Sequence, residues 1–135
     1  MKRRTFLAST VAALTLPVLA QATTNYTPGL VKKRLAAGET VFLVFGTEWC
    51  TTCAAQDRAI NALMQSNPDY DAKVTFIHVD YDQYGQSDLA KELKIPRRST
   101  LVVLKGTEEL GRIVAGTSKQ QIKDLMDIAL SATVA

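Results

Sequence analysis

The chain has few of the side chains that bind metal ions. Its 135 residues include two cysteines, Cys50 and Cys53, and one histidine, His78. A structural zinc site is held by about four nitrogen or sulfur ligands, and these three residues fall short of that number. The sequence therefore argues against a structural zinc site and leaves the two cysteines for another chemistry.

A long apolar run is also missing. The one extended apolar stretch, residues 6–20, follows Lys2, Arg3 and Arg4 and is shorter than the ~20 residues that cross a bilayer. It ends in small residues, with Ala22 at the expected cleavage site. We therefore expect residues 1–22 to be a cleavable signal peptide, and we expect no stable membrane insertion after its removal.

Arg3 and Arg4, with the three residues after them, resemble the twin-arginine export signal, and an ordinary Sec signal is the alternative. Both predict that a bacterium exports the protein to the periplasm, where disulfides can form. Residues 23–135 would then make one domain with 13 basic and 13 acidic residues. This neutral balance gives no support for nucleic-acid or membrane-surface binding.

The hydrophobic pattern predicts alternating helices and strands. Residues 40–45 and 73–79 have the β-branched and apolar composition of buried strands. Thr100 to Lys105 and Leu110 to Ala115 are spaced as an antiparallel hairpin, and residues 80–85 are expected to form a loop. Helices are predicted at residues 28–37, capped by Thr27 and stopped by Gly38, at 50–65, at 87–93 behind the cap Ser87, and after a cap at Thr117 or Ser118. This order predicts an α/β domain with a mixed central sheet and helices on both faces.

Both cysteines lie where a predicted strand meets a predicted helix. Cys50 would stand at the helix N-terminus, where free N–H groups favour a thiolate, and Cys53 would follow one turn later. Cys50 is expected to be the more exposed, attacking thiol, and Cys53 the resolving thiol. A purely structural disulfide is a weak alternative, because closing four residues removes only about 2 kcal/mol of chain entropy. Thr51 and Thr52 add neither charge nor imidazole, which favours a reductant or a moderate exchanger over a strong oxidant.

The element order and the segment Trp49-Cys50-Thr51-Thr52-Cys53 resemble the thioredoxin family over roughly residues 28–130. The short helix predicted at residues 87–93 is similar to one in periplasmic thioredoxin-like domains that relay reductant from the inner membrane. The resemblance implies the thioredoxin fold and a thiol–disulfide oxidoreductase that acts on protein disulfides. It implies no cofactor, and it suggests an inner-membrane electron relay as reductant donor and another periplasmic protein as client.

Beneath the cysteines the chain departs from the family pattern. Val44 occupies the position of a buried acid, and His78 occupies a position where lysine is common. His78 can assist deprotonation of Cys53 or can be a packed strand histidine, and Glu48 is either an alternative base or a solvated carboxylate. Trp49 either offers a flat surface to a partner or anchors its loop as a partly buried ring.

A third departure concerns the predicted substrate-binding residues Pro96, Ser99 and Thr100. The family has a cis-proline directly before this strand, whereas here Ser99 precedes Thr100. A non-proline cis bond costs about 3 kcal/mol, so a trans bond is expected at Ser99. Its hydroxyl can face the sulfurs, or the loop can present Pro96 instead. Arg97 and Arg98 either lower the thiolate pKa and attract an acidic partner or remain a solvated pair.

Two other functions remain open at this point. A non-catalytic binding module would keep the fold and lose substrate capture through the altered loop at Ser99. A metal carrier would use Cys50, Cys53 and His78 as ligands. Neither alternative requires the two cysteines to cycle between a dithiol and a disulfide.

Overall fold

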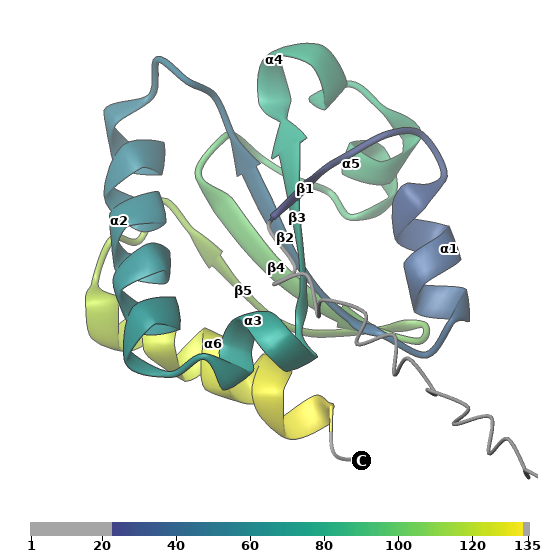
Figure 1. The fold of residues 1–135 in the computed structure, drawn as a ribbon. Coiled ribbons are helices and arrows are strands. Elements are labelled where there is room, and N and C mark those ends of the chain that lie inside the picture. Colours follow the sequence, from purple (N-terminus) through teal and green to yellow (C-terminus); the bar gives the residue numbers. More distant parts are fainter. Residues whose placement is uncertain (1–22, 134–135) are drawn as a thin grey trace, which may run out of the picture.

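A five-stranded mixed sheet forms the centre of the protein (Figure 1). This computed structural model describes residues 23–133, so the predicted signal peptide lies outside the described residues. The elements in chain order are β1 (Thr24–Asn25), α1 (Leu30–Ala36), β2 (Thr40–Gly46), α2 (Thr51–Ser66), α3 (Asp69–Lys73), β3 (Thr75–Asp80), α4 (Tyr81–Tyr84), α5 (Asp88–Glu92), β4 (Thr100–Lys105), β5 (Glu108–Val114) and α6 (Lys119–Ala132).

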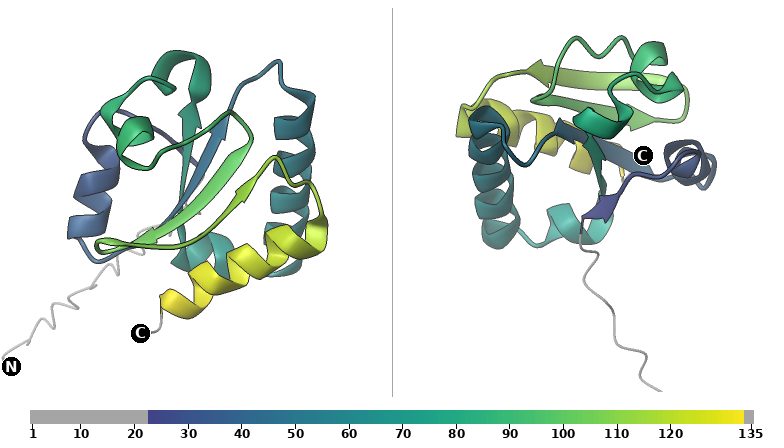
Figure 2. Two further views of the ribbon diagram at one scale, coloured as in Figure 1. Left: turned by 180° about the vertical axis from the view of Figure 1, so that it is seen from behind. Right: turned by 90° about the horizontal axis from the view of Figure 1, so that it is seen from above.

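The sheet has the order β1-β3-β2-β4-β5. β3 pairs in parallel with β1 and β2, whereas β4 pairs antiparallel with β2 and β5. Every residue of the central strand β2 is buried, because helices cover both faces of the sheet (Figure 2). The predicted α/β thioredoxin fold with a mixed sheet is therefore confirmed.

Two apolar clusters hold the layers together. On one face, side chains such as Phe42 and Phe76 pack beneath α2, α3 and α6. On the other face, Leu43 and Ile77 pack beneath α1 and α5. The alternation of β2 side chains between two apolar faces explains why Thr40 is the one residue with a polar side chain in this strand. The packing fixes the carboxyl end of β2, from which the cysteine segment leaves the sheet.

Several predicted boundaries were wrong. The first helix starts at Leu30 and not at Pro28, because Gly29 has a left-handed φ of 88° that interrupts the helical backbone. Its N-cap is therefore Gly29, without a side-chain cap hydrogen bond, and not the predicted Thr27. Residues 80–85 are not a loop: Asp80 caps the one-turn helix α4 by accepting a hydrogen bond from the Asp82 backbone. Two further elements, β1 and α3, were not predicted. Lys73 ends α3, so the second buried strand begins only at Thr75.

The remaining predictions are confirmed to within a few residues. Gly38 follows the first helix with a φ of 84°. Ser87 and Ser118 are the N-caps of α5 and α6, each accepting a backbone hydrogen bond three residues ahead. The predicted hairpin is formed by β4 and β5. Among residues 23–133, no helix is long and apolar enough to cross a membrane.

Candidate active site

The two cysteines lie at the N-terminus of the longest helix, α2. Cys50 is its N-cap, and its sulfur accepts a hydrogen bond of 3.2 Å from the Cys53 backbone N–H. Both thiols are free. Cys50 is 5% exposed and Cys53 is 3% exposed, so Cys50 is the more exposed thiol, as predicted, but both thiols are buried. A difference this small does not by itself distinguish the attacking from the resolving cysteine.

Ser99 lies directly against both sulfurs. Its Oγ is 3.2 Å from Cys50 Sγ and 3.0 Å from Cys53 Sγ. None of the described peptide bonds is cis, which confirms the trans bond expected at Ser99. Of the two alternatives for this loop, the structure has the Ser99 hydroxyl facing the sulfurs, while Pro96 is an exposed residue three positions earlier. Substrate binding by either residue stays a prediction.

Backbone and side-chain hydrogen bonds hold Ser99 in place. Its φ of 65° is unfavourable for a residue with a side chain. Its N–H donates to Phe45 O at 2.7 Å, and its carbonyl oxygen accepts from Ala115 N at 2.8 Å and from Gln56 Nε2 at 2.9 Å. Gln56 is completely buried. The prediction from sequence missed Gln56, although a polar residue three positions after Cys53 on the apolar side of a helix was a usable signal.

The next residue, Thr100, is turned away from solvent into the same loop. Its side chain is buried, and its Oγ1 donates a hydrogen bond of 2.7 Å to the carbonyl oxygen of Arg97. This bond closes the turn that brings Ser99 to the sulfurs. Thr100 therefore shapes the loop, and a direct contact with a substrate stays a prediction.

The surroundings of the two thiols separate their pKa values. Burial by itself would raise the pKa of Cys50, but hydrogen bonds from Cys53, Ser99 and Arg98 outweigh it and lower this pKa to about 6. Burial and the neighbouring Cys50 raise the pKa of Cys53. At neutral pH the dithiol thus holds one thiolate, at the helix N-terminus, and one thiol.

The exposed Trp49 and the half-buried Arg98 form the rim beside Cys50. The indole is 60% exposed, and its Nε1 donates a hydrogen bond of 2.7 Å to Asp82. The guanidinium carbon of Arg98 lies 4.2 Å from the centre of the indole ring, a cation–π distance. Trp49 is therefore an exposed flat surface rather than a partly buried anchor. Arg97 remains solvent-exposed, and its Nε donates only to the Arg98 carbonyl oxygen.

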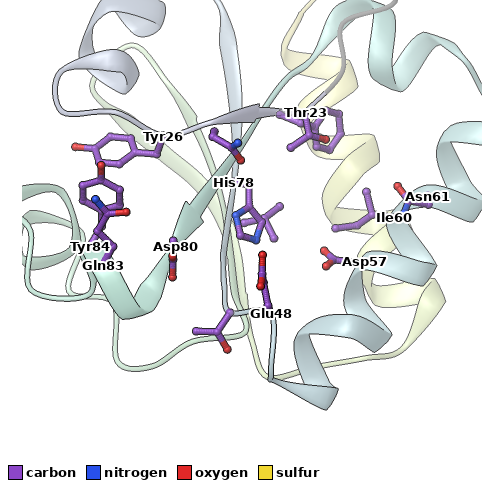
Figure 3. Close-up of a pocket in the computed structure, with 14 residues that line it drawn as sticks. Thr23, Tyr26, Glu48, Asp57, Ile60, Asn61, His78, Asp80, Gln83 and Tyr84 are labelled. Carbon is purple, nitrogen blue, oxygen red and sulfur yellow. The ribbon is translucent and has the colours of Figure 1, made fainter.

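A cavity of about 600 Å³ lies beside the segment that leads into the cysteines, with Thr47 and Glu48 among the residues that line it (Figure 3). His78 from β3 and Asp57 from α2 extend into it, and Val44 lies in its wall. Burial raises the pKa of Asp57, and the charge of His78 opposes that effect. Glu48 is exposed at the mouth of the cavity. Asp57 was not predicted as a site residue. Its position one helical turn after Cys53 was the sequence feature that could have indicated a carboxylate near the thiols.

The thioredoxin family model matches residues 18–128, most of the chain. The chain belongs to the thioredoxin family. Its cysteine segment corresponds to the C-x-x-C pair of that family, and its fold agrees with the resemblance seen in the sequence. The family and the cysteine pair together support thiol–disulfide oxidoreductase chemistry.

Solved structures with the same fold come from distant organisms. Trxlp from Edwardsiella tarda is 20% identical over 78% of this chain and 98% of its own, with a TM-score of 0.67. The oxidised mitochondrial thioredoxin 3 of Saccharomyces cerevisiae is 23% identical over 78% of this chain and 94% of its own, with a TM-score of 0.62. At such identities the likeness shows the fold alone. No curated protein sequence matches this thioredoxin-family chain significantly.

The metal-carrier alternative has no ligand set in the part of the chain that the structure describes. Within residues 23–133, no group of three or more cysteine, histidine or acidic side chains is arranged to hold a metal ion. Cys50, Cys53 and His78 therefore do not form the three-ligand site that a carrier would need. The geometry of this thioredoxin-family site therefore favours thiol chemistry over metal binding.

Proposed function

We propose that this thioredoxin-family protein is an exported oxidoreductase that reduces or exchanges disulfides of other proteins through Cys50 and Cys53. The observation that carries the proposal is the placement of Cys50 as the N-cap of α2, where its sulfur accepts a hydrogen bond from the Cys53 backbone N–H and lies 3.2 Å from Ser99 Oγ. These contacts lower the pKa of Cys50 to about 6. Only a thiolate attacks a disulfide. A thiol with this pKa is largely ionised at neutral pH, whereas an ordinary cysteine is largely protonated.

The reaction runs in two exchange steps. The Cys50 thiolate attacks one sulfur of the client disulfide, a mixed disulfide forms, and the second client sulfur leaves as a thiolate that takes up a proton. Cys53 then loses its proton and attacks Cys50 Sγ, which releases the first client sulfur. The client gains two electrons and the protein becomes the Cys50–Cys53 disulfide. A dithiol donor reverses this change; in the cell we propose an inner-membrane reductant relay, and no organic cofactor is required.

The proposed client surface surrounds Cys50. The exposed ring of Trp49 offers an apolar area to a peptide. The loop from Pro96 to Thr100 lies next to Trp49, with Ser99 closest to the sulfurs and Arg98 stacked on the indole. A client chain lying across Trp49 and this loop would bring its disulfide to Cys50.

Equilibration in glutathione buffers followed by thiol trapping tests the redox cycle. We expect the wild-type thiols to interconvert reversibly with the disulfide, and the protein to reduce insulin disulfides with dithiothreitol as donor. Cys50→Ser should lose this reductase activity, while Cys53→Ser should accumulate a mixed disulfide. Failure of the pair to cycle, or full activity in Cys50→Ser, would leave the non-catalytic binding module as the better account.

Export is tested separately with the full chain. Expression in a bacterium followed by fractionation should place the protein in the periplasm, with a mature N-terminus at Thr23. Replacing Arg3 and Arg4 by lysine should block export if the twin-arginine route is used, and should leave it intact for a Sec signal. Retention of an uncleaved chain in the cytoplasm would reject both routes. The mixed disulfide trapped by exported Cys53→Ser would identify the client.

A further inference from the structure

The second exchange step, which rests on the proposed function, requires a proton acceptor for Cys53. This thiol is buried, and burial raises its pKa, so it does not ionise readily at neutral pH. Val44, at the end of the central strand, is apolar and cannot accept a proton. The acceptor must be another group that reaches Cys53 from the cavity side.

Gly46 leaves an open path between Cys53 and His78. A Cβ atom placed on Gly46 would lie 3.4 Å from Cys53 Sγ and 3.5 Å from His78 Nε2. The Cβ atom of Cys53 lies 3.4 Å from the same point, so all three neighbours are at ordinary contact distance and a methyl group fits there. The two distances place Cys53 Sγ and His78 Nε2 within about 7 Å of each other, a span that a single water lying between the two atoms would bridge. The absence of a side chain at Gly46 therefore connects the buried sulfur to the cavity.

His78 is also placed beside a carboxylate. Asp57 is half-buried, lies one turn after Cys53 on α2, and faces the cavity wall that holds His78 (Figure 3). A nearby carboxylate favours an imidazolium. The cavity walls carry other titratable groups as well, on loops, at the end of β3 and on α4: Tyr26, Glu48, Asp80 and Tyr84. Asp80 is exposed and caps α4, and Glu48 is exposed at the mouth.

We propose that His78 takes the proton of Cys53 through the space beside Gly46, and that Asp57 is the positioning residue that stabilises the resulting imidazolium. The S–H bond of Cys53 breaks and an N–H bond forms at His78 Nε2. The Cys53 thiolate then attacks Cys50, the new disulfide forms, and the client sulfur leaves with the electron pair. The proton returns from His78 to solvent through the cavity, so no outside oxidant or reductant enters this step.

Stopped-flow reaction of the reduced protein with Ellman's reagent separates the two exchange steps. Attack by Cys50 releases the first thionitrobenzoate, and attack by Cys53 on the resulting mixed disulfide releases the second. The rate of the second release, measured from pH 5 to 9, should show an inflection from the proton acceptor. The first release reports Cys50 alone, so its absence would reject the proposed function and not this inference.

Three substitutions test the path. His78→Gln should slow the second release at pH 7 by about tenfold or more and abolish the inflection. Gly46→Ala should fill the path and slow the second release similarly, although it removes no titratable group. Asp57→Asn should cause a smaller slowing and change the pH profile of the second release, which a purely structural role of Asp57 would leave unchanged. The first release should keep its rate in all three variants.

Two further variants complete the design. Asp124→Asn alters an exposed carboxylate of α6 and should change neither release. Glu48→Gln tests the rival base: loss of the inflection in Glu48→Gln, with its retention in His78→Gln, would overturn the proposal. An unchanged second release in His78→Gln would also overturn it. If Gly46→Ala does not fold by circular dichroism, the pH profiles of the histidine and aspartate variants still decide the question.

Discussion

The buried side chain of Gln56 joins the cysteine helix to the loop that carries Ser99. Its Nε2 donates one hydrogen bond of 2.9 Å to the carbonyl oxygen of Ser99 and another of 2.9 Å to that of Gly116. The two acceptors lie before β4 and after β5. The distance between the sulfurs and the Ser99 hydroxyl therefore depends on a residue that touches neither sulfur.

We expect Gln56→Leu to lower the free energy of unfolding by about 2 kcal/mol. Leucine is similar in size, but it leaves the half-buried Gly116 carbonyl oxygen without the Gln56 donor and removes one of two donors from the carbonyl oxygen of Ser99. Urea denaturation monitored by circular dichroism measures the loss. Gln120→Leu, at an exposed position of α6, is the control and should change stability little. Equal stabilities of the two variants would contradict the bridging role of Gln56.

Removal of the Ser99 hydroxyl should raise the pKa of Cys50. Ser99→Ala deletes one of the hydrogen bonds that lower this pKa to about 6 and leaves the helix N-terminus and Arg98 in place. The pH midpoint of iodoacetamide alkylation at Cys50 should move upward by roughly one unit. Ser66→Ala, an exposed serine at the end of α2, should keep the wild-type midpoint. An unshifted midpoint in Ser99→Ala would mean that the hydroxyl does not stabilise the thiolate.

The parts of this structure that could be predicted from sequence are those set by neighbours along the chain. The β-branched run at residues 40–45 and the cysteines behind it sufficed to predict a buried strand followed by an N-terminal thiol. The short helices α3 and α4 were missed because elements of five and four residues carry too little periodicity. A cap such as Asp80 was visible only as part of an acidic loop.

The missed site residues depend on contacts between distant segments. Gln56 and Asp57 are ordinary polar positions within α2, and their roles come from Ser99 and His78, which other elements bring to the helix. Likewise, the position of Arg98 over Trp49 joins residues 49 positions apart. No local pattern contains these pairings, because the packing of β2 between β3 and β4 creates them.

Arg98 should influence both the pKa of Cys50, through its charge, and the environment of the Trp49 ring, through stacking. Arg98→Met removes the cation, so the alkylation midpoint of Cys50 should rise and should respond less to added salt. Arg98→Lys keeps the charge but loses the flat guanidinium that stacks on Trp49, so its midpoint should rise less. Because Trp49 is the one tryptophan of the chain, fluorescence reports the stacking directly, and both variants should change the emission. Identical midpoints in the two variants would argue against an effect of the charge.

The stability of the reduced protein should rise between pH 6 and pH 9. Folding lowers the pKa of Cys50 from its ordinary 9.0 to about 6. A group with a lowered folded pKa contributes its full stabilisation above the unfolded pKa and loses it as the pH falls through the folded pKa. The full difference is up to about 4 kcal/mol. Cys53 has a raised pKa, so it opposes this trend only as the pH approaches and passes 9.

Urea denaturation under a reductant at pH 6, 7 and 8 measures this slope. Cys50→Ser removes the titrating thiol, so its free energy of unfolding should rise less with pH than that of the wild type. The two slopes should differ by up to about 1.4 kcal/mol per pH unit. Cys53→Ser keeps the Cys50 thiolate but loses its Cys53 thiol partner, so part of the slope should remain. If wild type and Cys50→Ser have the same pH dependence, the Cys50 thiolate is not stabilised by folding, and its reactivity must arise during the encounter with the client.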